Sequence, residues 1–144
     1  MLFRRFAFAA LLATATPAVA LAQSADQPSP DLSVELNTVE DIDRGCLLTF
    51  LVSNKTEVTI EDVIFEIVVF DALGSVQKLV TYNMGELPVD RHRVRQFVQP
   101  DTTCDNVGRL LINDTGTCLV DGAESEICSD ALSLSSRVDV ELFR

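Results

Sequence analysis

The sequence predicts an all-β protein that folds as a β-sandwich of about seven short strands. Apolar and polar residues alternate with a period of two in almost every segment after residue 30, which is the pattern of strands in a sheet. Turn-forming residues separate these segments, and no stretch combines a helical apolar repeat with capping residues. About seven short strands at this spacing are typical of a β-sandwich.

The alternating segments define the expected strands. They lie at residues 32–36, 46–52, 63–70, 75–84, 91–98, 107–113 and 132–142. The last is expected to be one strand with a single apolar face. Two Asn-x-Thr triplets, at residues 54–56 and 113–115, match the glycosylation pattern, and we interpret both as turns.

The first 22 residues have the three parts of a secretory signal peptide. A pair of arginines precedes an apolar stretch that ends in Ala20-Leu21-Ala22, the small-x-small pattern that signal peptidase requires. A transmembrane anchor is disfavoured because the stretch is rich in Ala and Thr rather than Leu. Residues 1–22 are therefore predicted to be removed, and no transmembrane anchor is expected after cleavage.

The rest of the chain divides into a short leader and one domain. Residues 23–30 contain Ser, Asp and two Pro, which predicts a flexible leader, and residues 31–144 are expected to form a single β-sandwich. The chain has 11 Lys and Arg and 22 Asp and Glu, so cleavage, which removes two arginines, leaves 9 basic and 22 acidic residues. This negative charge argues against nucleic acid as a partner. The predicted location is periplasmic or secreted.

The cysteines indicate disulfides. An even number of cysteines in an exported chain favours disulfide pairing, and four cysteines allow three connectivities. We favour Cys118–Cys128 together with Cys46–Cys104, which would close a short loop and tie an early strand to a late loop. Zinc binding and thiol exchange are the alternatives, but the close Cys pairs that both usually show are absent from the sequence.

Residues 46–98 resemble a known family. Leu-Val-Ser-Asn-Lys-Thr at 51–56, Ile-Val-Val-Phe-Asp-Ala-Leu-Gly at 67–74 and Leu87-Pro88 are similar to the small bacterial domains named for an F-x-L-Y-D motif. Other residues stand at the name-giving positions of that motif: Ile67, Val69 and Phe70. The resemblance implies an immunoglobulin-like sandwich in an exported protein, with no catalytic residues. The whole chain also resembles uncharacterised small periplasmic proteins of Gram-negative bacteria.

The sequence lacks the groups of a hydrolytic site. A catalytic triad needs a base held against a nucleophile, and His92, the only His, lies between Arg91 and Arg93 on an expected surface strand. No Gly-x-Ser-x-Gly turn presents a serine. We therefore predict that the chain is not an enzyme and needs no cofactor.

The segment at 63–70 is apolar on both faces. Ile64, Val68 and Phe70 lie opposite the expected core. Such a strand is unusual in a sandwich whose sheets have one solvated face. Either another segment covers these residues or they form a docking surface for another protein. We expect the second, with another envelope protein as the partner.

Arg91, Arg93 and Arg95 alternate along one strand and share one face. One hypothesis is a positive stripe that binds an acidic partner or a lipid headgroup. The other, which we favour, is cross-strand pairing with the protein's own acids together with protection of a sheet edge.

Asp121, Glu124 and Glu126 lie between Cys118 and Cys128 and offer carboxylate oxygens. Ca²⁺ prefers several such oxygens on a tight loop, but the calcium-loop pattern Asp-x-Asp-x-Asp-Gly is absent from the sequence. Solvated surface charge is therefore the favoured interpretation. The sequence predicts a non-catalytic binding or accessory module that acts through protein–protein contacts, with binding of a divalent cation or small ligand by acidic loops as the alternative.

Overall fold

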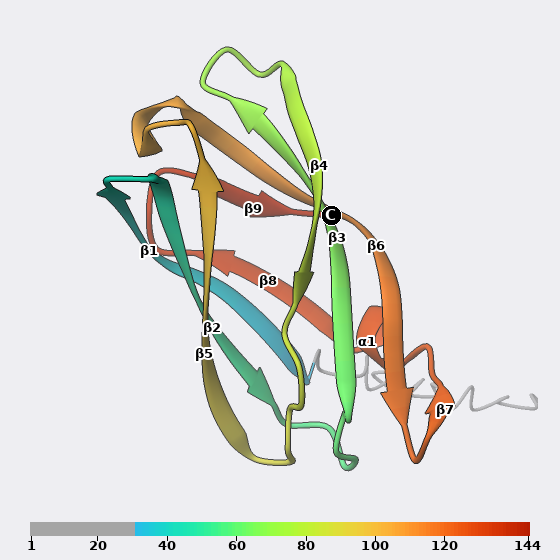
Figure 1. Cartoon of the computed structure of the whole chain (residues 1–144). Coiled ribbons are helices and arrows are strands. Elements are labelled where there is room, and N and C mark those ends of the chain that lie inside the picture. The colour runs from blue at the N-terminus through green and yellow to red at the C-terminus, as the bar shows by residue number, and fades with distance from the viewer. Residues whose placement is uncertain (1–30) are drawn as a thin grey trace, which may run out of the picture.

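The computed structural model describes residues 31–144 and confirms an all-β chain arranged in two facing sheets (Figure 1). The predicted signal peptide at 1–22 and leader at 23–30 lie outside the described residues. Among residues 31–144, no helix is both long and apolar enough to cross a membrane.

The first sheet has the strand order β5-β2-β1-β8. Neighbouring strands are antiparallel except β1 and β8, which are parallel. Its strands are β1 (Leu32–Ile42), β2 (Gly45–Asn54), β5 (Arg91–Pro100) and β8 (Leu132–Ser136).

The second sheet has the order β4-β3-β6-β7, and β9 runs parallel to the first part of β6. Its strands are β3 (Asp62–Asp71), β4 (Val76–Asn83), β6 (Val107–Val120), β7 (Ala123–Glu124) and β9 (Glu141–Phe143). Two short helical turns complete the described chain, η1 (Cys104–Asn106) before β6 and α1 (Ile127–Asp130) before β8.

The core lies between the sheets and is built from alternate residues of the long strands. On β2 and β3 the residues predicted to face the core are fully buried, which confirms the predicted inner face of each strand. These residues are Cys46, Leu48, Phe50, Val52, Val63, Phe65, Ile67 and Val69.

Three predicted strands were wrong in extent. The strand expected at 32–36 continues to Ile42. The strand expected at 107–113 continues to Val120, so the triplet at 113–115 lies inside β6 and is not a turn. The single strand expected at 132–142 is instead broken, with β8 in the first sheet and β9 in the second. Between them Ser136 Oγ donates to the carbonyl oxygens of Val138 and Val140, at 3.0 and 2.6 Å, which bends the chain from one sheet to the other.

Both disulfides join the predicted partners. Cys46 of β2 is bonded to Cys104 of η1, and Cys118 of β6 is bonded to Cys128 of α1. No cysteine of the described residues is free. Two disulfides indicate an oxidising, extracytoplasmic environment for the folded protein.

The strands β4 and β5 lie together at one side of the sandwich, each at the margin of its own sheet. Tyr82 of β4 stacks on Phe97 of β5 with ring centroids 4.0 Å apart, and Phe50 meets both rings edge-on. In the described part of the chain, β4 pairs with β3 alone and β5 with β2 alone. This side of the molecule therefore presents two strand edges, whereas β8 and β9 approach each other near the opposite margins.

Candidate functional site: the outer face of the β3 sheet

The outer face of the second sheet carries two adjacent rows of apolar side chains. Register places Val68 between Leu79 of β4 and Leu111 of β6, and Leu111 pairs in turn with Phe143 of β9. The next row contains Phe70 opposite Val76. We call these side chains the outer apolar face: Val68, Phe70, Val76, Leu79, Leu111 and Phe143.

The outer apolar face is most exposed along the β3–β4 hairpin. Val76 is 64% exposed and Leu79 is 59% exposed, and Leu73 in the hairpin turn is 92% exposed. The hairpin turn projects at the top of Figure 1. Of the described residues, the large apolar side chains that are this exposed lie on the hairpin or, in the case of Val94, on β5. Exposed apolar side chains are therefore concentrated at the side of the sandwich where the two strand edges lie.

A cation borders the outer apolar face. The guanidinium carbon of Arg109 lies 5.0 Å from the ring centre of Phe70 and 5.4 Å from that of Phe143. The two rings are 6.2 Å apart. Cation–π attraction holds the Arg109 side chain over these rings, so it shields them more than it shields Val76 and Leu79.

The predicted docking residues are not one group in the structure. Ile64, Val68 and Phe70 are all half-buried on the outer side of β3. A polar row that contains Glu66 and Asp114 separates Ile64 from Val68. Val68 and Phe70 therefore belong to the outer apolar face, whereas Ile64 stands apart from it.

The predicted arginine stripe points inward at the margin of the sandwich. Register places Arg91, Arg93 and Arg95 on the face of β5 that continues a buried face of β2. Arg95 Nε donates to the carbonyl oxygen of Met84 at 2.6 Å, and Arg93 Nη1 donates to that of His92 at 3.2 Å. These partners are main-chain carbonyls rather than the expected carboxylates.

The three acids of the Cys118–Cys128 loop lie on the surface of the protein. Asp121 and Glu124 lie in the β6–β7 hairpin and Glu126 just before α1, and all three are exposed. No group of three or more potential metal ligands gathers anywhere in residues 31–144. Glu124 Oε2 accepts from the main-chain N–H of Cys118 at 3.4 Å, while the nearby Gly122 N–H donates to Glu61. Of the three acids, Glu124 therefore contacts the main chain of its own loop.

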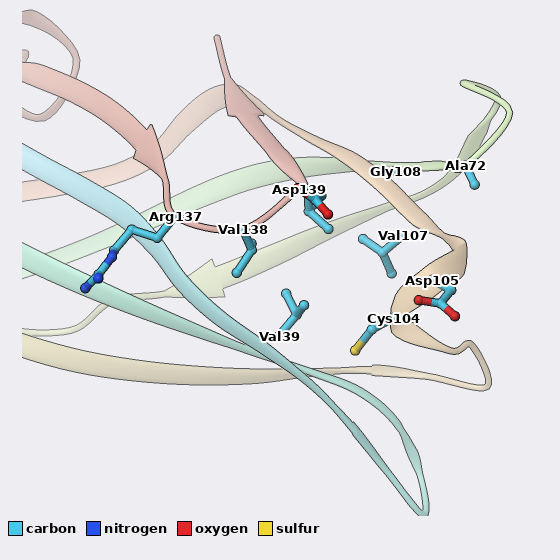
Figure 2. A pocket seen from close by; sticks show the side chains of 10 residues that line it. Val39, Ala72, Cys104, Asp105, Val107, Gly108, Arg137, Val138 and Asp139 are labelled. Carbon is cyan, nitrogen blue, oxygen red and sulfur yellow. The ribbon is translucent and has the colours of Figure 1, made fainter.

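A cavity of about 650 Å³ opens between β1, the start of β6 and the segment that joins β8 to β9. Figure 2 shows the side chains of Val39, Val107 and Val138 turned toward one another in this cavity. The carboxylates of Asp105 and Asp139 lie apart from each other at its border. The cavity is therefore a recess open to solvent with a mixed polar and apolar lining, and its two aspartates do not converge on one point.

Sequence reasoning missed most of the outer apolar face. Val76, Leu79, Leu111 and Phe143 come from three other strands, and each looks ordinary in its own segment. They meet Val68 and Phe70 only through cross-strand register, which is not visible in a single sequence. The apolar residues of β4 were the one local signal, but they did not show which side of the strand is exposed.

The residues that carry the family resemblance lie at the ends of β2 and β3 and in the connections that follow them. The side-chain oxygen of Asn54 accepts hydrogen bonds from the main-chain N–H and the hydroxyl of Thr56. Asp71 Oδ1 accepts from the N–H groups of Leu73 and Ser75 and closes the β3–β4 turn. These residues therefore shape turns in this chain. In comparisons of the whole chain, no family model, no curated protein and no solved structure matches it.

Proposed function

We propose that this protein is a non-catalytic binding or accessory module that docks onto another envelope protein through its outer apolar face. In this proposal residues 1–22 are a cleaved signal peptide, the mature protein is periplasmic or secreted, and the sandwich is immunoglobulin-like. The cysteine pairing and the two-sheet architecture support this proposal.

The exposure of the β3–β4 hairpin is the observation that carries the proposal. Monomeric soluble proteins rarely leave apolar side chains of this size exposed side by side, and such patches mark interaction surfaces. Val76 and Leu79 lie on an edge strand, and each is paired with a half-buried apolar residue of β3, Phe70 and Val68 respectively. A partner that covered Leu79 alone would gain about 2 kcal/mol.

Site-specific photo-crosslinking in the producing bacterium tests the proposal. A photoreactive amino acid at position 79 is expected to yield one adduct of defined mass with an envelope protein. Leu79→Asp is expected to weaken binding of that protein, once purified, by about thirtyfold, because about 2 kcal/mol of apolar contact is lost.

Val94 provides the matched control, because it is 58% exposed and lies on the edge strand of the other sheet. Val94→Asp should leave the binding unchanged, and both variants should keep the melting temperature of the wild type because both sites are exposed. Failure to obtain an adduct from position 79, or the same adduct from positions 79 and 94, would contradict the proposal.

A further inference from the structure

The main-chain groups of β5 that face away from β2 belong to alternate residues. The N–H of Asp101 donates to the carbonyl of Arg44, which continues the unbroken β2–β5 register. In an antiparallel pair every second residue bonds to the neighbouring strand, so residues 91, 93, 95, 97 and 99 bond to β2. The N–H and carbonyl groups of His92, Val94 and Gln96 therefore point to the edge that, in the described chain, has no partner strand.

Two of these edge carbonyls are already occupied by arginines. Arg93 Nη1 donates to the carbonyl oxygen of His92 at 3.2 Å, and Arg95 Nη1 donates to that of Val94 at 3.0 Å. Each guanidinium thus folds back onto the residue before its own. The edge presents positive charge and N–H donors, while two of its acceptors are covered.

The charge of β5 is opposite to that of the chain as a whole. The chain has a formal net charge of −11, yet the ten residues of β5 include three arginines and no acid. Positive charge in a protein with so few basic residues favours a negatively charged partner at this edge.

The geometry points to β5 as a strand-addition site for an extended acidic segment of another protein. Carboxylates of the incoming strand would draw Arg93 and Arg95 away from the carbonyls, because a charge-assisted Arg–carboxylate bond is stronger than one to a neutral carbonyl. The freed carbonyls of His92 and Val94 would then accept N–H groups of the new strand. A neutral strand has nothing to displace the arginines, so the edge selects acidic segments.

The alternation of side chains along a strand determines which partner sequence would fit at this edge. Side chains of an added strand that lie on the inner side of the sheet would meet Arg91, Arg93 and Arg95, and those on the outer side would meet the exposed Val94. The segment recognised is therefore one in which Asp or Glu alternates with apolar or β-branched residues. This site is separate from the outer apolar face and does not depend on it.

Calorimetric titration of the mature, disulfide-bonded protein with synthetic peptides tests this inference. The probe is a peptide of about nine residues, enough to pair along β5, that alternates Glu with Val and Thr. We expect it to bind at least about tenfold more tightly than the same peptide with Gln for Glu, with weaker binding as salt is raised from about 0.02 M to about 0.3 M. Main-chain amide shifts of His92, Val94 and Gln96 should change on binding.

Variants separate strand addition from its alternatives. Arg93→Ser should lose the preference for Glu over Gln, whereas Arg44→Ser, which removes the same charge from the exposed β1–β2 turn, should keep it. A peptide N-methylated at the amides that would face β5 should bind at least about tenfold more weakly.

Three results would overturn the inference. Absence of binding by the Glu peptide would mean that the arginines only protect the edge. Equal binding by the N-methylated peptide would mean simple charge attraction. Pairing of β5 between copies of this chain, seen as dimers in sedimentation that Arg93→Ser abolishes, would make a second copy the occupant.

Discussion

Gln99 and Tyr82 form a polar pair that is buried between the two sheets. Gln99 is 1% exposed and Tyr82 is 4% exposed. Gln99 Nε2 donates to the Tyr82 hydroxyl oxygen, and within residues 31–144 Gln99 Oε1 has no hydrogen-bond partner. Burial raises the pKa of Tyr82 to about 12, although the Gln99 hydrogen bond partly offsets this effect. The core thus strongly favours the neutral phenol.

Stability should therefore fall at high pH because of Tyr82. An unfolded chain releases this proton near pH 10.0, whereas the folded chain keeps it until about pH 12. Between these values the folded state binds more protons, so the stabilisation is complete below pH 10.0 and is lost as the pH rises through about 12. Two pKa units correspond to about 2.7 kcal/mol at most.

Urea unfolding at about pH 9 and about pH 11.5 measures this effect, with Tyr82→Phe as the control because it cannot titrate. The unfolding free energy of the wild type should fall between these pH values by about 2 kcal/mol more than that of Tyr82→Phe. Equal falls in both proteins would show that the folded protein does not retain the phenol proton.

At the scale of elements, buried Asn54 fixes the connection between β2 and β3. Its Nδ2 donates to the carbonyls of Val58 and Leu87, at 2.9 and 2.7 Å, while its oxygen accepts from Thr56. Leu87 also exchanges main-chain hydrogen bonds with Ile60. One side chain therefore joins the β2–β3 connection to the segment that leads into β5.

Asn54→Ala should lower the free energy of unfolding by about 3 kcal/mol, because it leaves several buried main-chain groups without partners. Asn113→Ala is the matched control from the second Asn-x-Thr triplet, since Asn113 is exposed on β6. Its effect should stay within about 0.5 kcal/mol. Urea denaturation of the two variants gives the comparison, and similar costs in both would contradict the assigned role of Asn54.

The sequence pattern predicted the strands themselves better than it predicted which strands lie side by side. Alternation placed Cys46, Phe50 and Val63 in the core because a strand's period of two needs no knowledge of its partner. The same alternation hid the break after Ser136, since the apolar residues on either side keep their spacing while they enter different sheets. The hydrogen bonds of Ser136 bend the chain from one sheet into the other, and the apolar pattern gives no sign of this bend.

At the scale of the whole molecule, the disulfides constrain the unfolded chain to different degrees. Cys46–Cys104 closes a segment with a sequence separation of 58, and Cys118–Cys128 one of 10. Chain-entropy arguments assign about 4 kcal/mol to the longer loop and about 3 kcal/mol to the shorter one.

Paired Cys→Ala variants test this order. Removal of Cys46 and Cys104 together should lower the urea midpoint more than removal of Cys118 and Cys128, because the longer crosslink restricts the unfolded chain more. Reduction of the wild type should lower the midpoint further than either paired variant. A larger loss from the short-loop variant would show that local packing around α1 outweighs loop length.

The parallel pairing of β1 with β8 sets the order in which this protein can acquire structure. Leu32 lies beside Leu132, and Arg109 lies beside Glu141, so neither sheet has all its strands until residues 132–143 have been synthesised. Contacts between distant parts of a sequence slow folding, because the intervening chain must first be brought together. We therefore expect the polypeptide to emerge from the ribosome largely unstructured, and a translocation channel can thread a chain in that state.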